Sequence, residues 1–397
     1  MKRLLVVSVG LAALMVGMVV AWYAVRQERE FQRLIAAGDA AGAQDQTSSA
    51  IEAFSGALAL KRDSMLAHLK RGDTYRRRGE LDAALRDLRE ASRLDPSAPR
   101  PLELLGDVNA VLGNYGRAAE HYHSFTQLDD RSPRVLYKLG LAHFRNSHTA
   151  EAIEPLQHAI GLDTRFAEAH YLLAMCLRQR SENDAALKAL TRAVEINGAF
   201  VEAREALADV YEQAGRRQQA IEQLEALAAL EPARGERLIG VALAYARWGR
   251  TETAILTLGR AAERFPGRTD VYVALGRVWL DVAEGRNDSV ALNKAIEALR
   301  PRATSADAPA DALMWYGRAM LLSGDATGAE RALVRATSKA PVDPLAYRYL
   351  ADAAERLGHL AAAVDALVRY AALIDDRDID STINDRLARL EQRLRRG

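Results

Sequence analysis

Apolar and polar residues alternate with a helical period through the stretch from Met65 to Ala98. In each half of it, apolar or small residues recur every three or four positions, as they do on one face of a helix. These residues are Leu66, Leu69, Gly72 and Tyr75 in the first half, and Leu81, Ala84, Leu85, Leu88 and Ala91 in the second. Arg78-Gly79-Glu80 interrupts the pattern, and Asp95-Pro96 ends it because a residue before proline avoids the helical region. The stretch therefore predicts two amphipathic helices joined by a short turn.

The same pattern recurs along the chain at a constant interval. A small residue of the first helix recurs as Gly38, Gly72, Gly106, Gly140, Ala174, Ala208 and Ala242. A small residue of the second helix recurs as Ala50, Ala84, Ala118, Ala152, Ala186, Ala220 and Ala254, followed four places later by Phe54, Leu88, Tyr122, Leu156, Leu190, Leu224 and Leu258. Small residues are required where two helices cross closely, because a larger side chain would not fit.

This period and these positions resemble the tetratricopeptide repeat, a helix–turn–helix unit whose length equals the interval from Gly38 to Gly72. The resemblance covers residues 31–377, which corresponds to about ten units. It implies an all-α fold, a right-handed superhelix or α-solenoid, in which each hairpin buries its apolar stripe against its neighbours. In the eighth unit we expect an insertion over residues 283–309, with a lengthened turn at 283–288 and a loop from Pro301 to Pro309.

Two further features interrupt or end the array. Pro155 falls inside the second helix of the fourth unit, where it should bend the helix by removing one backbone hydrogen bond. Residues 379–397 are predicted to form a basic amphipathic helix, with Leu387, Leu390 and Leu394 on one face. Because a solenoid needs a terminal cap with a polar outer face, capping is the role we expect for it, with lipid or acidic-partner contact as the alternative.

The chain begins with Met1-Lys2-Arg3 and an uncharged run from Leu4 to Val25. Twenty-two helical residues span roughly 33 Å, which is enough to cross a bilayer core. Trp22 and Tyr23 lie where an interfacial aromatic belt would be. We interpret residues 1–27 as an uncleaved membrane anchor; the alternative is a cleaved signal peptide, which the length of the run and the bulk of Trp22 disfavour.

Basic residues flank this run on both sides, so the charge distribution only weakly favours one membrane orientation over the other. Lys2 and Arg3 favour a cytoplasmic N-terminus, whereas Arg26, Arg29 and Arg33 oppose it. We expect a single-pass protein of the bacterial inner membrane with its repeats in the periplasm; repeats on the cytoplasmic face are the alternative.

Composition argues against several function classes. The net charge of +1 gives no electrostatic reason to expect a nucleic-acid partner. No phosphate-binding loop, HExxH, GxSxG or CxxC motif occurs, so neither catalysis nor a cofactor is predicted. Six of the eight histidines lie between His121 and His170. His121 and His123 would point to different faces of a helix, and His143 and His148 have no obvious third ligand, so no metal site is predicted.

The resemblance also implies where a partner would bind. In tetratricopeptide repeats the first helix of each unit lines a concave groove, and in the fourth and fifth units its groove positions hold Tyr137, Leu141, Phe144, Arg145, Tyr171, Met175 and Arg178, with Arg134 beside them. Aromatic rings and a methionine rimmed by arginine suit a peptide segment. The alternative is that some of these rings are buried between helices.

In the sixth unit the groove positions are acidic: Glu202, Glu205, Asp209 and Glu212. Such a stripe needs a cation or a basic partner to offset its repulsion, or is simply a solvated helix face.

These observations predict a non-enzymatic, membrane-tethered scaffold that binds a protein or peptide partner in cell-envelope assembly or export. The alternative is a non-catalytic accessory subunit of an envelope enzyme complex, for polysaccharide or lipopolysaccharide synthesis or cytochrome c maturation. The oligomeric state is not predicted.

Overall fold

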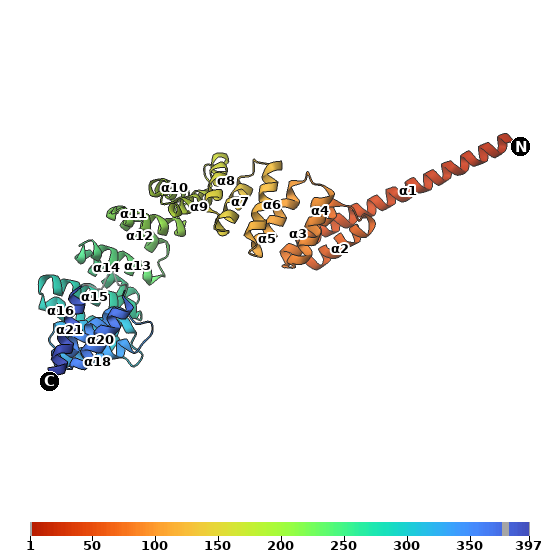
Figure 1. Ribbon diagram of the computed structural model, residues 1–397. Helices are drawn as coiled ribbons and strands as arrows, with labels where there is room; N and C mark the ends of the chain where they lie inside the picture. Colours follow the sequence, from red (N-terminus) through yellow and green to blue (C-terminus); the bar gives the residue numbers. More distant parts are fainter. Residues whose placement is uncertain (1, 375–380, 397) are drawn as a thin grey trace. The chain divides into compact units, whose positions relative to one another are not determined.

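The computed structural model describes residues 2–374 and 381–396, with side chains from 14 to 374 and from 382 to 395. All regular secondary structure in these residues is helical and forms 21 helices, so the all-α repeat architecture predicted from the sequence is confirmed. The chain divides into two compact units, Met1–Ala203 and Arg204–Gly397. Each unit is a stack of antiparallel helix pairs (Figure 1).

The first unit contains five helix pairs in chain order. The helices are α1 (Lys2–Ala43), α2 (Thr47–Leu60), α3 (Met65–Arg78), α4 (Leu81–Leu94), α5 (Pro99–Val111), α6 (Tyr115–Leu128), α7 (Pro133–Arg145), α8 (Thr149–Leu162), α9 (Ala167–Gln179) and α10 (Asn183–Ile196). The long helix α1 includes both the apolar N-terminal run and the first helix of the first repeat, without a break between them.

The second unit contains the remaining helices. They are α11 (Val201–Gln213), α12 (Arg217–Leu230), α13 (Gly235–Arg247), α14 (Thr251–Arg264), α15 (Thr269–Arg286), α16 (Ser289–Ala303), α17 (Ala310–Leu322), α18 (Ala326–Thr337), α19 (Pro344–Leu357), α20 (Leu360–Leu373) and α21 (Ser381–Arg396). Helix α11 spans the boundary between the two units, since it begins at Val201.

The two helices of a repeat cross at the small residues that the sequence pattern picks out. Ala84, Ala118, Ala152 and Ala186 are fully buried. A Cβ atom added to Gly106 would lie 2.4 Å from Cε1 of Tyr122, and one added to Gly140 would lie 2.6 Å from Cγ of Leu156. Both distances are too short for non-bonded carbon atoms, so glycine is what allows these helices to approach.

The turn inside each of the first seven repeats contains one residue with a positive φ, always at the same repeat position. The position is occupied by Asp45, Gly79, Gly113, Ser147, Ser181, Gly215 and Gly249, with φ between 56° and 81°. This left-handed conformation ends a helix and favours glycine, which occupies four of these positions. The other three repeats adopt it with an aspartate or a serine.

The eighth repeat differs from the sequence prediction. The lengthened turn expected at residues 283–288 is mostly helix, because α15 continues to Arg286 and ends at the left-handed Asn287. The added residues have packing partners: Ala283 is buried, and Glu284 accepts a hydrogen bond of 2.9 Å from Arg318. Likewise α16 continues through Pro301 to Ala303, which shortens the expected loop.

Helix α8 runs from Thr149 to Leu162 with Pro155 inside it. Because proline has no N–H, the helix supplies no donor to the carbonyl of Glu151. The bend that we expect at this point stays a prediction.

Helix α21 packs on the last repeat. Leu390 is buried in a cluster with Ala363 and Leu367, and Arg386 pairs with Asp352 at 2.7 Å and with Glu355 at 2.8 Å. Leu387 and Leu390 of the predicted leucine face therefore pack on the repeat, whereas Leu394 is exposed, as are arginines such as Arg389 and Arg395. The predicted boundary between repeats and cap, at residues 377–379, lies outside the described residues.

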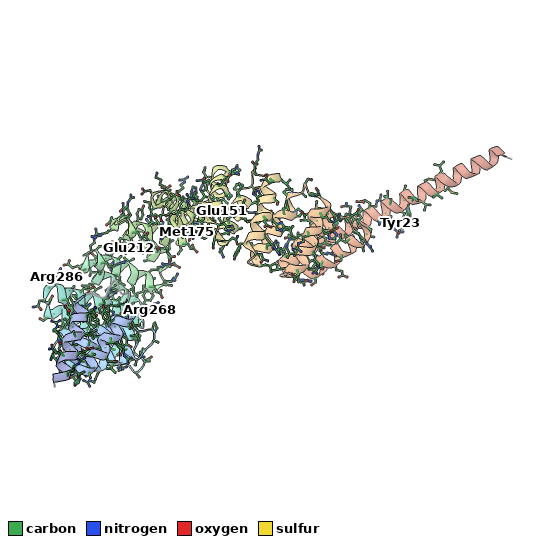
Figure 2. All side chains as sticks on the ribbon, viewed as in Figure 1. Tyr23, Glu151, Met175, Glu212, Arg268 and Arg286 are labelled. Atoms are coloured by element: carbon green, nitrogen blue, oxygen red, sulfur yellow. The ribbon has the colours of Figure 1, made fainter. Side chains whose placement is uncertain are left out.

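The first part of α1 extends beyond the helix pairs, and Figure 2 labels Tyr23 on it. Among the described residues, no helix proves both long enough and apolar enough to cross a membrane. The anchor predicted at residues 4–25 is therefore not supported, although the side chains of residues 4–13 lie outside the described part. The apolar side chains that follow, from Leu14 to Val25, are exposed.

Candidate partner-binding surface

Two tyrosines of the predicted groove are each packed against a phenylalanine that comes from the next inter-repeat loop. Tyr137 on α7 lies 5.0 Å from Phe166, and Tyr171 on α9 lies 5.1 Å from Phe200, measured between ring centroids. Phe166 and Phe200 directly precede α9 and α11. Both pairs tilt their rings, a favourable geometry for aromatic side chains. The tyrosines are half-buried, so each ring keeps an accessible part while its position is restrained.

The other apolar residues of the predicted groove are also half-buried. Leu141 and Phe144 pack with Tyr137 against a buried cluster that includes Leu172 and Cys176. Burial raises the pKa of Tyr137, and the carboxylate of Glu168 adds to the effect. The rings of Tyr137 and Phe144 are thus partly covered by neighbouring helices and partly accessible, which lies between the two possibilities considered from the sequence.

The remaining predicted residues of the fourth and fifth repeats lie around these rings. Met175, labelled in Figure 2, and Arg178 are half-buried on α9, whereas Arg145 is exposed at the end of α7. The Arg145 guanidinium lies 6.0 Å from the centroid of Tyr115, within cation–π range.

A network of charged side chains lies on α5 and α7, the second of which also carries Tyr137. The carboxylate of Glu103, whose side chain is only 5% exposed, pairs with Lys138 at 2.8 Å and with Arg134 and Arg100. Lys138 also pairs with Asp107 at 2.6 Å, and Asp107 accepts a hydrogen bond of 2.8 Å from the hydroxyl of Tyr122. These contacts tie the third repeat to the fourth.

The electrostatics of this network follow from burial and charge together. Burial alone would raise the pKa of Glu103, but the hydrogen bonds from Lys138 and Arg134 and the charges of Lys138 and Arg100 outweigh it and hold the pKa at about 2. Burial also raises the pKa of Tyr122, with the Asp107 carboxylate adding to the shift. At neutral pH the network therefore holds an ionised carboxylate and a neutral phenol.

The acidic residues of the predicted groove belong to the second unit, apart from Glu202 at its boundary. Glu205 pairs with Arg237 at 2.5 Å, and Glu212 pairs with Arg247 at 2.5 Å. Both arginines come from α13, so the next first helix of the array offsets part of the acidic stripe. Asp209 is exposed on the same helix as Glu205, in a different compact unit from Tyr137.

The histidine and cysteine side chains show no metal site among the residues whose side chains are described. No group of three or more histidine, cysteine, aspartate or glutamate side chains there is arranged to hold a metal ion. Cys176 is fully buried, and this burial raises the pKa of its thiol to about 11. A thiol that stays protonated at neutral pH is a poor ligand and a poor nucleophile.

Phe166 and Phe200 are the two residues of this surface that sequence reasoning missed. Their spacing along the chain equals that of Tyr137 and Tyr171, and this match is the signal that identifies them. They lie in loops between repeats, whereas the groove positions considered were all on helices.

Comparison with protein families gives two matches. The tetratricopeptide repeat family model matches residues 35–99, 69–133, 205–269 and 323–380, which together span more than half of the chain. The model for subunit 3 of the anaphase-promoting complex, or cyclosome, matches residues 117–193. No curated protein matches the chain.

Several solved structures are similar to parts of the chain. MamA is 30% identical, over 41% of this chain and 95% of its own, with a TM-score of 0.40. YrrB, described as a TPR protein with an unusual peptide-binding site, is 23% identical over 46% of this chain and 94% of its own, with a TM-score of 0.42. The C-terminal part of a TPR repeat-containing protein from Cytophaga hutchinsonii is 17% identical over 60% of this chain and 98% of its own, with a TM-score of 0.52, and this likeness concerns the fold alone.

Proposed function

Because the chain belongs to the tetratricopeptide repeat family, we propose that it is a non-enzymatic scaffold that binds a protein or peptide segment on the surface around Tyr137 and Tyr171. The surface also includes Leu141, Phe144 and Met175, with Arg134, Arg145 and Arg178 around them. This combination of aromatic, methionine and arginine side chains is typical of binding hot spots.

The two tyrosine–phenylalanine pairs are the observation that carries this proposal. Tyr137 and Tyr171 occupy equivalent positions on successive first helices, and Phe166 and Phe200 restrain their rings in the same way. A ring that is already fixed loses little side-chain entropy when a partner covers it. Two such rings at a repeat spacing can hold alternate side chains of one bound segment.

Site-specific photo-crosslinking in cells tests this proposal. We would replace Tyr137 or Tyr171 with p-benzoylphenylalanine, and use the exposed Lys188 on α10 as the control position. Both tyrosine positions should give the same crosslinked partner, and Lys188 should not give it. Equal crosslinking from all three positions, or none from the two tyrosines, would exclude this surface.

We further propose that residues 1–27 tether the scaffold to the bacterial inner membrane, with the repeats in the periplasm, for a role in envelope assembly or export. The exposed apolar side chains from Leu14 to Val25 support this proposal, since a continuous apolar surface of this kind usually has a partner. Trp22 and Arg26 lie at the end of it in cation–π contact, at 5.4 Å. A tether would raise the effective concentration of the binding surface near membrane partners.

Two measurements test the tether and its orientation. The full chain should stay in the membrane fraction after alkaline carbonate extraction, whereas a variant lacking residues 1–27 should be released. Alkaline phosphatase fused after Gly397 should be active if the repeats are periplasmic. An inactive phosphatase together with a bright fluorescent-protein fusion would place them in the cytoplasm.

A further inference from the structure

Helices α6, α7 and α8 enclose a second groove, with a volume of about 1120 Å³. Apolar residues, among them Leu136, Leu139 and Pro155, contribute to its lining. On α7 the groove residues Leu136, Leu139 and His143 lie about 100–160° around the helix axis from Tyr137, because each helical residue turns by about 100°. The groove is therefore distinct from the tyrosine surface.

The charged residues that line this groove are all acidic. They are Glu120, Asp130, Glu151 and Glu154, and Figure 2 labels Glu151 on α8. Four histidines also line it, namely His123, His143, His148 and His158, whereas no lysine or arginine does. The carboxylates have no lysine or arginine within the lining to offset them, which favours a cationic ligand.

The corresponding positions of the neighbouring repeats have a different charge. One repeat earlier, the positions of Glu120, His123, Gln127 and Glu151 hold Arg86, Arg89, Arg93 and Arg117. One repeat later, the positions of Asn146, Glu154 and His158 hold Arg180, Lys188 and Arg192. The acidic lining is thus a property of this groove and not of the repeat.

One buried polar atom of a groove residue lacks a hydrogen-bond partner. The buried Nδ1 atom of His143 has no hydrogen-bond partner among the described residues. Burial lowers the pKa of His143, so its ring is neutral at pH 7 and does not repel a cation. No group of three or more histidine, cysteine, aspartate or glutamate side chains among the described residues is arranged to hold a metal ion, so we consider an organic cation.

We propose that this groove is a second protein-binding site, which takes a basic peptide segment of a partner, with lysine or arginine side chains between apolar ones. The apolar residues of the segment contact the apolar part of the lining, and its cationic groups pair with Glu120, Glu151 and Glu154. A guanidinium or ammonium group donates charge-assisted hydrogen bonds to these carboxylates.

A peptide-binding measurement with the full chain in mild detergent tests this proposal. The probe is a fluorescein-labelled peptide of alternating leucine and arginine, LRLRLR, and its binding is followed by fluorescence anisotropy. The triple variant E120Q/E151Q/E154Q should bind it about tenfold more weakly, since each ion pair contributes a modest amount. The peptide LELELE should bind to neither protein. Circular dichroism would verify that the variant keeps its helices.

A second triple variant controls for net charge. Glu195, Glu222 and Glu252 are exposed on α10, α12 and α14, and none of them lines this groove. E195Q/E222Q/E252Q removes the same number of charges and should bind LRLRLR as the unmodified chain does. The proposal fails if the unmodified chain does not bind LRLRLR, if the groove variant binds it equally well, or if both triple variants lose binding to the same extent. None of these results would affect the tyrosine surface, whose crosslinking test is independent.

Discussion

The Nζ atom of Lys138 lies 2.8 Å from Oε1 of Glu103, across the contact between the first helices of the third and fourth repeats. The carboxylate of Glu103 is almost fully buried, and its pKa of about 2 is well below the ordinary value of 4.5. A carboxyl group whose pKa falls on folding stabilises the protein above its unfolded-state pKa. This contribution is lost as the pH falls from about 4.5 towards 2.

We therefore expect Glu103→Gln to destabilise the first unit by about 1–3 kcal/mol at pH 7. The upper value corresponds to the full pKa shift, and the exposure of Arg134 and Arg100 to solvent reduces it. The difference from the unmodified protein should shrink steadily as the pH is lowered below 4.5. Urea unfolding followed by circular dichroism at pH 7, 5 and 3.5 measures it. A loss of stability that is the same at pH 7 and pH 3.5 would contradict this electrostatic explanation.

Gly106→Ala should destabilise the third repeat, because the added Cβ would lie 2.4 Å from the ring of Tyr122. Tyr122 is buried and hydrogen-bonded to Asp107, so its ring cannot move away freely. Overpacking of this kind costs about 1–3 kcal/mol. The control is Gly161→Ala on α8, where a Cβ has nothing within 4 Å. This variant should be neutral or more stable by up to about 1 kcal/mol, because alanine favours a helix over glycine. The comparison fails if the two variants shift the urea midpoint equally.

Ser181→Gly should stabilise the turn of the fifth repeat, because Ser181 adopts a φ of 62°. A left-handed conformation costs a residue with a side chain roughly 1 kcal/mol relative to glycine. The reverse exchange at the same position of the next repeat, Gly215→Ser, should destabilise by a similar amount, since Gly215 has a φ of 67°. Urea midpoints of the two variants should move in opposite directions. Movement in the same direction would show that serine carries no penalty in this turn.

Phe166→Ala should weaken partner contact at Tyr137 and leave contact at Tyr171 largely unchanged. Each phenylalanine restrains only one tyrosine, with ring centroids 5.0 Å apart for Phe166 and Tyr137. Photo-crosslinking from position 137 should therefore fall, while crosslinking from position 171 should persist. Phe200→Ala provides the reciprocal control and should reverse the two results. If either variant reduced crosslinking from both positions equally, the rings would not be positioned separately.

The repeat architecture could be predicted because the packing that creates it requires particular residues at fixed spacing. Gly106 must be small opposite Tyr122, and the same requirement recurs once in every repeat, so the period is visible in the sequence. The helical part of the eighth repeat was not predicted, because Gly285 and Asn287 resemble turn residues. Helix α15 passes through Gly285 and stops only at Asn287.

The candidate sites could be predicted less completely. Tyr137 and Tyr171 follow from the repeat positions, but Phe166 lies in a loop that those positions do not include. His143 and Glu151 come from different helices, and only folding places both on one groove. Arg237 belongs to the repeat after that of Glu205, so its pairing with the acidic stripe also depends on how neighbouring helices stack.

The unbroken course of α1 has a mechanical consequence. The residues from Leu14 to Val25 and the first helix of the first repeat form one rod, with no loop between them to act as a swivel. A membrane or a partner bound to the N-terminal part of α1 would therefore fix the orientation of the first repeat relative to itself. Inserting a single alanine between Val25 and Arg26 would rotate that repeat by roughly 100° relative to the residues before it, while Gln27 and Glu28 keep their contacts with Leu60 and Lys61.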